Sequence, residues 1–226
     1  MSVQHELLLL AWGTLVGLDL ASVPQVMIAR PLVAGVVAGA LLGDLPTGLQ
    51  LGVLFELLQQ DVLHLGAARY PEYGPATVAS VAAAHATAGA FGVGFGVVVG
   101  LFTGLVGGLS VHSVLRPWNT RTVHRAAARL DRGDASALAR VHATCLLRDA
   151  LRGALVTAFG LVLAAGVRPY LVGTLSVRGA IVLAAVAMGT AAAGGVGGML
   201  RLLGQRRNLG WFAAGLLGGA AGVWWR

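Results

Sequence analysis

Residues 30–57, RPLVAGVVAGALLGDLPTGLQLGVLFEL, form two apolar pieces separated by a polar turn. The pieces, residues 31–43 and 45–55, are each too short to cross a hydrocarbon core of about 30 Å as a helix that rises about 1.5 Å per residue. Together they predict a re-entrant helical hairpin near residues 31–58, an arrangement that marks transport sites in membrane proteins. Glycines at every fourth position, 35, 39 and 43, predict close helix packing there. The alternative, a hairpin in the core of a soluble protein, is disfavoured by the composition of the chain.

That composition predicts a protein embedded in a membrane. Of the 226 residues, 57% are hydrophobic and 11% are charged, whereas soluble domains carry about 25% charged residues. Residues 73–115, 179–200 and 208–225 contain no Asp, Glu, Lys or Arg. The first run is about twice the length that one crossing needs, roughly 20 residues, and predicts two helices joined by a turn near residues 91–94. With a further helix over residues 7–23, the predicted fold class is an all-α membrane protein, a multi-helix transmembrane bundle.

The distribution of arginine predicts the topology. The net charge is +7, and all 16 basic residues are arginine. Half of them lie between residues 116 and 152: Arg116, Arg121, Arg125, Arg129, Arg132, Arg140, Arg148 and Arg152. Such a cluster between apolar runs is typical of a cytoplasmic loop, and its spacing predicts one or two amphipathic helices on the membrane surface. Nucleic-acid binding, which a high pI also raises, is the less favoured interpretation.

The chain thus divides into three predicted regions. Residues 1–115 form an N-terminal membrane region with the hairpin and a candidate binding site, and residues 116–152 form the Arg-rich cytoplasmic loop. Residues 153–226 form the C-terminal membrane helices, whose arginines near residue 201 return to the side of the Arg-rich loop and leave the C-terminus on the opposite face.

Ionisable residues interrupt only the first third of the apolar chain. An acidic group at the centre of a membrane helix costs about 2.5–3.5 kcal/mol, so each such residue is a candidate functional residue. The set comprises Asp19, Arg30, Asp44, Glu56, Asp61, His64, Arg69 and Glu72. Because one carboxylate can accept hydrogen bonds from two neighbouring hydroxyls, the set predicts a site for a polyhydroxylated solute.

Individual members of this set have alternative interpretations. Glu56 follows an uncharged piece and is the strongest candidate for substrate contact. Asp44 is favoured as a cap of the turn over a substrate ligand. Arg30 is interpreted as forming a structural ion pair with Asp19 or Asp44, or as contacting substrate, and His64 as bonding a sugar hydroxyl or a protein group. No metal-ligand spacing, cofactor motif or nucleophile triad is present in the sequence, so no catalytic residue, metal or cofactor is predicted.

Several short motifs then carry a family resemblance. They are Arg-Pro-Leu at residues 30–32, Leu-Gly-Asp at 42–44, Thr-Gly at 47–48, Leu-Phe-Glu-Leu at 54–57, Gly-Ala-Ala at 66–68 and Pro-Glu at 71–72. In this order and spacing the chain resembles the IIC subunit of the mannose/fructose/sorbose family of phosphotransferase-system (PTS) sugar permeases. The resemblance implies a multi-pass protein of the bacterial inner membrane that moves a hexose inward.

The resemblance also implies partners and roles. A IID membrane subunit would complete an oligomeric complex, and soluble IIA and IIB subunits would supply the phosphoryl group, so neither Cys145 nor any histidine here would carry it. Glu56 and the segment from Gly66 to Glu72 would line the sugar path, and Asp44 would shape the re-entrant tip. The candidate substrate-binding residues are therefore Glu56, Asp44, His64, Gly66, Glu72 and Asp19.

The sequence departs from the family pattern in places. His64 stands where the family often has Asn, and Glu72 stands where it has Asp. The chain ends at Arg226 after a segment that resembles the penultimate helix of the family. The alternative function is accordingly a non-transporting regulatory or scaffold subunit of an incomplete PTS.

Overall fold

The computed structural model describes residues 2–60, 70–87, 89–174, 176–203 and 210. Its described residues form helices and no strand. In chain order the helices are α1 (Val3–Ala21), α2 (Pro31–Leu42), α3 (Leu45–Gln60), α4 (Tyr73–His85), α5 (Gly89–Ser110), a π-helical turn η1 (Val111–Leu115), α6 (Arg116–Leu130), α7 (Ala135–Thr174) and α8 (Val177–Leu203). The all-helical fold class predicted from the sequence is confirmed.

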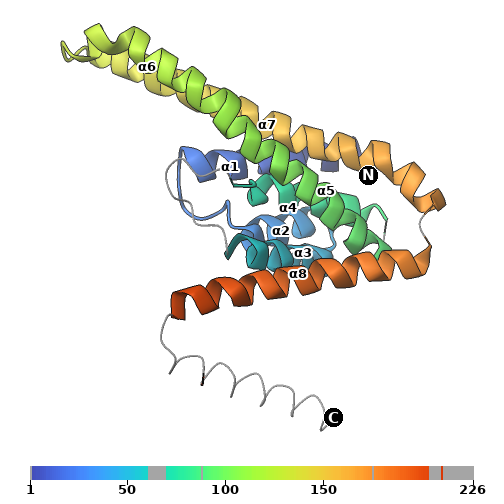
Figure 1. The fold of residues 1–226 in the computed structure, drawn as a ribbon. Coiled ribbons are helices and arrows are strands. Elements are labelled where there is room, and N and C mark those ends of the chain that lie inside the picture. Colours follow the sequence, from blue (N-terminus) through green and yellow to red (C-terminus); the bar gives the residue numbers. More distant parts are fainter. Residues whose placement is uncertain (1, 61–69, 88, 175, 204–209, 211–226) are drawn as a thin grey trace.

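Helices α2 and α3 form the predicted helical hairpin (Figure 1). Pro31 occupies the first turn of α2, where its missing N–H costs nothing, and Gly43 ends the helix with φ of 69°. The two helices touch through glycine: a Cβ added to Gly35 would lie 2.6 Å from the carbonyl oxygen of Gly48. Because small residues let the two backbones approach this closely, the hairpin packs as one tight unit.

Helix α4 is the centre of the bundle. Every residue from Tyr73 to Ala84 is buried, and α4 packs against α1, α2, α3, α5 and α7. Leu9, Val16, Phe55 and Val81 form part of the surrounding apolar core. The site residues that precede α4 are consequently held at the junction of several helices.

The predicted turn near residues 91–94 is wrong, because α4 ends at His85 and α5 already begins at Gly89. Gly92, inside the predicted turn, serves helix packing. A Cβ on Gly92 would lie 2.5 Å from the carbonyl oxygen of Ala84. This close approach holds α5 against α4, and Gly92 lies within α5 at the position where the sequence indicated a bend.

The Arg-rich segment is helical, as predicted, but its helices are not separate elements. Helix α6 continues α5 through η1, and α7 runs without a break over 40 residues. At about 1.5 Å per residue α7 is about 60 Å long, roughly twice a hydrocarbon core. The described residues contain two stretches long and apolar enough to cross a membrane, Phe91–Leu130 and Ala135–Leu171. The polar ends of these stretches form a hairpin that projects beyond the bundle (Figure 1).

Candidate functional site

A cluster of buried ions joins three segments of the bundle. Arg152 of α7 donates from Nη2 to Glu72 Oε1 at 3.0 Å and from Nη1 to Glu72 Oε2, and its Nε donates to Asp149 Oδ1 at 3.0 Å. The hydroxyl of Ser22 donates to Asp149 Oδ2 at 2.5 Å. Glu72 and Asp149 are 1% exposed and Arg152 is 7% exposed. The fork of the guanidinium therefore neutralises carboxylates that would be costly to bury alone.

This cluster changes the interpretation of Glu72. Predicted as a substrate ligand, Glu72 in the described conformation has both oxygens bonded to Arg152. Sequence analysis did not select Arg152 or Asp149 as site residues, because both were counted in the polar segment. The available signal was their spacing of three residues immediately before an apolar run, which places both on one face of a helix.

Asp19 has a structural task in the segment between α1 and α2. Its carboxylate accepts from the N–H of Val26 at 2.7 Å and from the N–H of Ala29 at 3.0 Å. Gln25 and Met27 in this segment have φ of 57° and 69°, a region that residues other than glycine seldom occupy. The buried carboxylate thus holds an irregular backbone in place next to the helix ends.

Arg30 pairs with Glu56, and the predicted pairing with Asp19 or Asp44 is wrong. Arg30 Nη2 lies 2.5 Å from Glu56 Oε1, and Glu56 Oε2 accepts from the N–H of Leu32 at 3.2 Å. The antiparallel hairpin explains the choice, because the start of α2 and the end of α3 lie at the same end. Glu56 thereby also satisfies a free N–H in the first turn of α2, where a negative charge is favourable.

Asp44 lies at the opposite end of the hairpin. Its Oδ1 accepts from the N–H of Thr47 at 3.3 Å, as predicted for a cap of the turn, and its Oδ2 lies 3.1 Å from His85 Nδ1. Helix α2 has 12 residues, which separates Asp44 from Arg30 by about 18 Å. The structure therefore does not bring Asp44 and Glu56 to one ligand. His85 was missed because nothing local in the sequence links it to Asp44, 41 positions earlier.

A polar cleft opens beside the Arg30–Glu56 pair. Its volume of about 410 Å³ lies within the range of ligand sites, roughly 300–1,000 Å³. The lining residues are Asp19, Leu20, Gln25, Met27, Ala29, Arg30, Gln59 and Tyr70. They bring together α1, the segment after it and the end of α3, so the two predicted residues Asp19 and Arg30 meet in this cleft.

Gln59 is one of three polar residues of the cleft that sequence analysis missed, with Gln25 and Tyr70. Its Oε1 is buried and accepts no hydrogen bond from the part of the chain that the structure describes. A buried acceptor without a donor costs about 1–3 kcal/mol, so a donor from a ligand would be favourable there. As an uncharged residue at the end of an apolar helix, Gln59 gave no signal in a search for ionisable groups.

Two predicted ligands, His64 and Gly66, lie outside the described residues. Within the described ranges, no group of three or more His, Cys, Asp or Glu residues is placed to hold a metal ion. The candidate site is therefore a binding site built from a carboxylate–guanidinium pair, an amide and a polar cleft.

The described residues thus form a helical bundle with two helices long and apolar enough to cross a membrane and with a polar cleft of ligand size. A solved structure titled "Structure of membrane protein" shares the fold with a TM-score of 0.79 at 19% identity, over 97% of this chain and 87% of that one. A second, titled "CryoEM Structure of Mannose Transporter ManYZ and Microcin E492 (MceA) complex", has a TM-score of 0.62, also at 19% identity and with the same coverage. No curated protein sequence matches the chain.

The family follows from a match over nearly the whole chain. The family model described as "PTS system sorbose-specific iic component" matches residues 3–221. The chain belongs to this family, and the IIC identity predicted from the sequence is confirmed. The chain is therefore a membrane protein of the sugar-transporting phosphotransferase system.

Proposed function

We propose that this chain is the subunit through which a hexose crosses the bacterial inner membrane in a mannose-type PTS. The observation that carries the proposal is the family match over residues 3–221, in a chain whose described residues include a polar cleft of ligand size. A IID membrane subunit completes the complex, and soluble IIA and IIB subunits phosphorylate the sugar. The chain itself supplies binding and passage, with no catalytic residue of its own.

The cleft supplies the hydrogen-bonding groups that a sugar needs. Arg30 and Gln59 line the cleft; Arg30 donates, and Gln59 Oε1 accepts from a hydroxyl in place of its missing protein donor. Glu56 does not line the cleft but is paired with Arg30, so its carboxylate accepts from the sugar when that pair opens. Arg30 is 52% exposed at its side chain, so its pairing with Glu56 is weak enough to open. A hexose entering the cleft exchanges this ion pair for hydroxyl contacts to both partners.

The proposal assigns different tasks to the other predicted residues. Asp19 holds the wall of the cleft through Val26 and Ala29. Glu72 fixes the start of α4 through Arg152, and Asp44 fixes the tip of the hairpin. A direct contact of Glu72 or Asp44 with the sugar stays a prediction.

The test is uptake of radiolabelled hexose by membrane vesicles that contain this chain, a IID partner and the soluble subunits. Glu56→Gln and Gln59→Leu are expected to lower uptake at least tenfold, because each removes an acceptor for a sugar hydroxyl. Glu6→Gln, the same charge change on the exposed side of α1, is the matched control and leaves uptake unchanged. Uptake that survives both cleft variants would refute the assignment of the cleft.

The regulatory alternative is favoured by one observation, the α6–α7 hairpin that projects beyond the bundle (Figure 1). Arg121, Arg125 and Arg129 on this hairpin are exposed. In that case the hairpin binds a partner protein and the cleft does not transport a sugar. Neutralising Arg121, Arg125 and Arg129 would then abolish partner capture, while Glu56→Gln would have no effect on any activity of the complex.

A further inference from the structure

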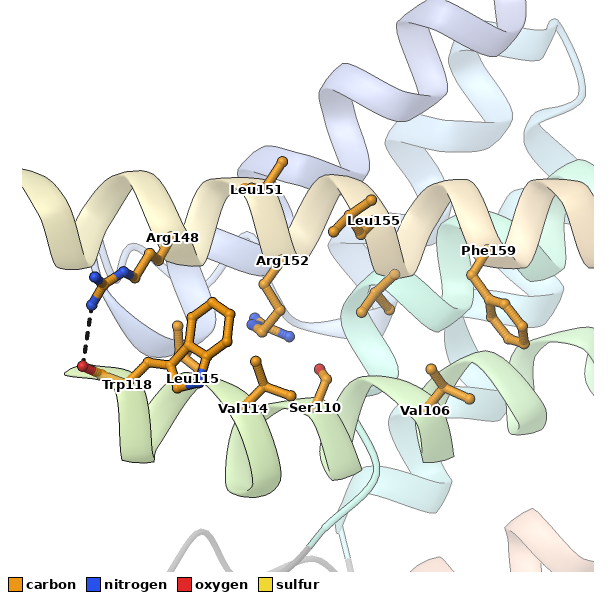
Figure 2. Close-up of a pocket in the computed structure, with 11 residues that line it drawn as sticks. Val106, Ser110, Val114, Leu115, Trp118, Arg148, Leu151, Arg152, Leu155 and Phe159 are labelled. Carbon is orange, nitrogen blue, oxygen red and sulfur yellow. Dashed lines mark hydrogen bonds between the residues drawn. The ribbon is translucent and has the colours of Figure 1, made fainter. Parts of the chain in front are cut away.

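An apolar groove runs along the outside of the bundle, away from the cleft. It lies between the continuous α5–η1–α6 helix and α7, has a volume of about 440 Å³ and is shown in Figure 2. Leu151, Leu155 and Trp118, which line it, are 58%, 61% and 53% exposed. We call it the α5–α7 groove. An open apolar groove of this kind on a membrane protein is expected to bind an apolar ligand or partner.

The groove changes from apolar to cationic along its length. Val106 and Phe159 lie at one end, and Arg148 and Trp118 lie at the other (Figure 2). Arg148 Nη1 donates to the carbonyl oxygen of Trp118 at 3.1 Å and to Thr122 Oγ1 at 2.5 Å. Both bonds use the same nitrogen, so the guanidinium is fixed in place and keeps Nε and Nη2 for an anionic group. A tryptophan beside it is typical of the interface between hydrocarbon and headgroups.

The other charges at the groove do not compete with Arg148. Arg152 also lines the groove, but it is buried and bonded to Glu72 and Asp149. Asp149 is 1% exposed and is held by Arg152 and Ser22. The available charge at the polar end is therefore positive, which is complementary to a phosphate.

The length of the groove fits one leaflet. Arg148 and Phe159 lie on α7 about 16 Å apart at roughly 1.5 Å per residue, and half of a hydrocarbon core is about 15 Å. A chain of lipid that starts at the level of Arg148 would thus reach Phe159 near the middle of the bilayer. A transmembrane helix from a partner would cover the apolar walls equally well, but its apolar face would leave Nε and Nη2 of Arg148 without an acceptor.

We propose that the α5–α7 groove binds one anionic phospholipid, with an acyl chain along Leu151, Leu155 and Phe159 and the phosphate at Arg148. Arginine suits this role because its planar fork can donate two hydrogen bonds to one phosphate. The site is independent of the sugar cleft. It joins the two long helices at the base of the projecting hairpin, so its occupant fixes their spacing.

Native mass spectrometry of the delipidated full-length chain tests the proposal. The protein is titrated with phosphatidylglycerol and with phosphatidylcholine that carry the same acyl chains. One phosphatidylglycerol is expected to bind several-fold more tightly than phosphatidylcholine. Arg148→Gln is expected to weaken phosphatidylglycerol about fivefold to tenfold and phosphatidylcholine little, since one arginine near the headgroups contributes an attraction of that order.

Leu155→Trp tests the acyl-chain part without touching a charge. Leu155 is largely exposed, so the larger ring fills the groove and is expected to weaken both lipids. Leu147→Trp on an exposed position of the same helix and Arg121→Gln on α6 are matched controls outside the groove, and both should stay within about twofold of the unmodified chain. Thermal unfolding of every variant shows that it is folded.

Three results would overturn the proposal. They are equal binding of the two lipids by the unmodified chain, loss of binding in the control variants to the same degree as in the groove variants, and release of the lipid when the chain is purified together with its partner membrane subunit. The last result would assign the groove to a protein helix.

Discussion

Replacing Arg152 by glutamine should destabilise the bundle more than the removal of any other charge in the described part of the chain. Arg152 is 7% exposed and bonds Glu72 twice and Asp149 once. Without it, two carboxylates that are each 1% exposed lose their cation, and no other described arginine or histidine forms an ion pair with either. Breaking one partner out of a buried pair costs about 3–5 kcal/mol. For a chain of this size that corresponds to a fall in Tm of roughly 6–20 °C.

A double-mutant cycle separates this electrostatic cost from lost packing. In Arg152→Gln with Glu72→Gln the Glu72 position is neutral and can hydrogen bond, so the part of the loss that comes from Glu72 should be recovered, while the part that comes from Asp149, which still lacks its cation, should remain. The assay is thermal unfolding in detergent, with Arg121→Gln on exposed α6 as the control that should change Tm little. A loss below about 1 kcal/mol in Arg152→Gln, as for a surface pair, would refute the buried cluster, and so would strict additivity in the double variant.

Three further predictions follow from other parts of the structure. Glu56→Gln should lower the free energy of unfolding by less than about 1 kcal/mol, because its partner is half exposed, while hexose uptake falls. Thermal unfolding and uptake are measured on the same variant, and a fall in uptake that only accompanies unfolding would contradict a binding role. Gly39→Leu should lower stability by roughly 1–3 kcal/mol or more, because a Cβ there would lie 2.7 Å from the carbonyl oxygen of Asp44; Gly166→Leu, with nothing within 4 Å, is the control, and the two are compared by thermal unfolding. Ser136, the N–H of Ala137 and Arg129 hold the pKa of Asp134 well below its ordinary value of 3.8. The folded state is therefore favoured by the ionised form, and this contribution is complete above about pH 5 and declines as the pH falls through and below the ordinary pKa. Helicity measured by circular dichroism between pH 7 and 3 should fall less steeply in Asp134→Asn than in the unmodified chain; identical profiles would contradict the argument.

The hairpin could be predicted from the sequence because its signals are local. The first apolar piece starts with a proline and ends with a glycine, and these determine where α2 begins and ends, within the range that was predicted. The turn between α4 and α5 was placed wrongly because it was inferred from the length of the charge-free run of residues 73–115. That length indicates two helices but does not fix where the first one ends.

The site could be predicted only in part, for a related reason. The position of Glu56 in an apolar stretch indicates that burying its charge costs free energy, but it does not identify the residue whose charge offsets that cost. Arg30 is paired across a hairpin, and Arg152 is 80 positions from Glu72. Gln59 carries no charge and became visible only through the missing donor at its buried oxygen.

The unbroken length of α7 gives the protein a mechanical link. The outer end of α7 at Ala135 and the buried guanidinium at Arg152 belong to one continuous helix, so they are about 26 Å apart on a single stiff rod. Under the proposed function, a soluble subunit that displaces the outer end of α7 would therefore also move the part of the helix that carries Arg152. Arg152 is bonded to Glu72 before α4 and to Asp149, which is bonded to Ser22 after α1. A small rotation of α7 there would therefore act on three segments of the bundle at once.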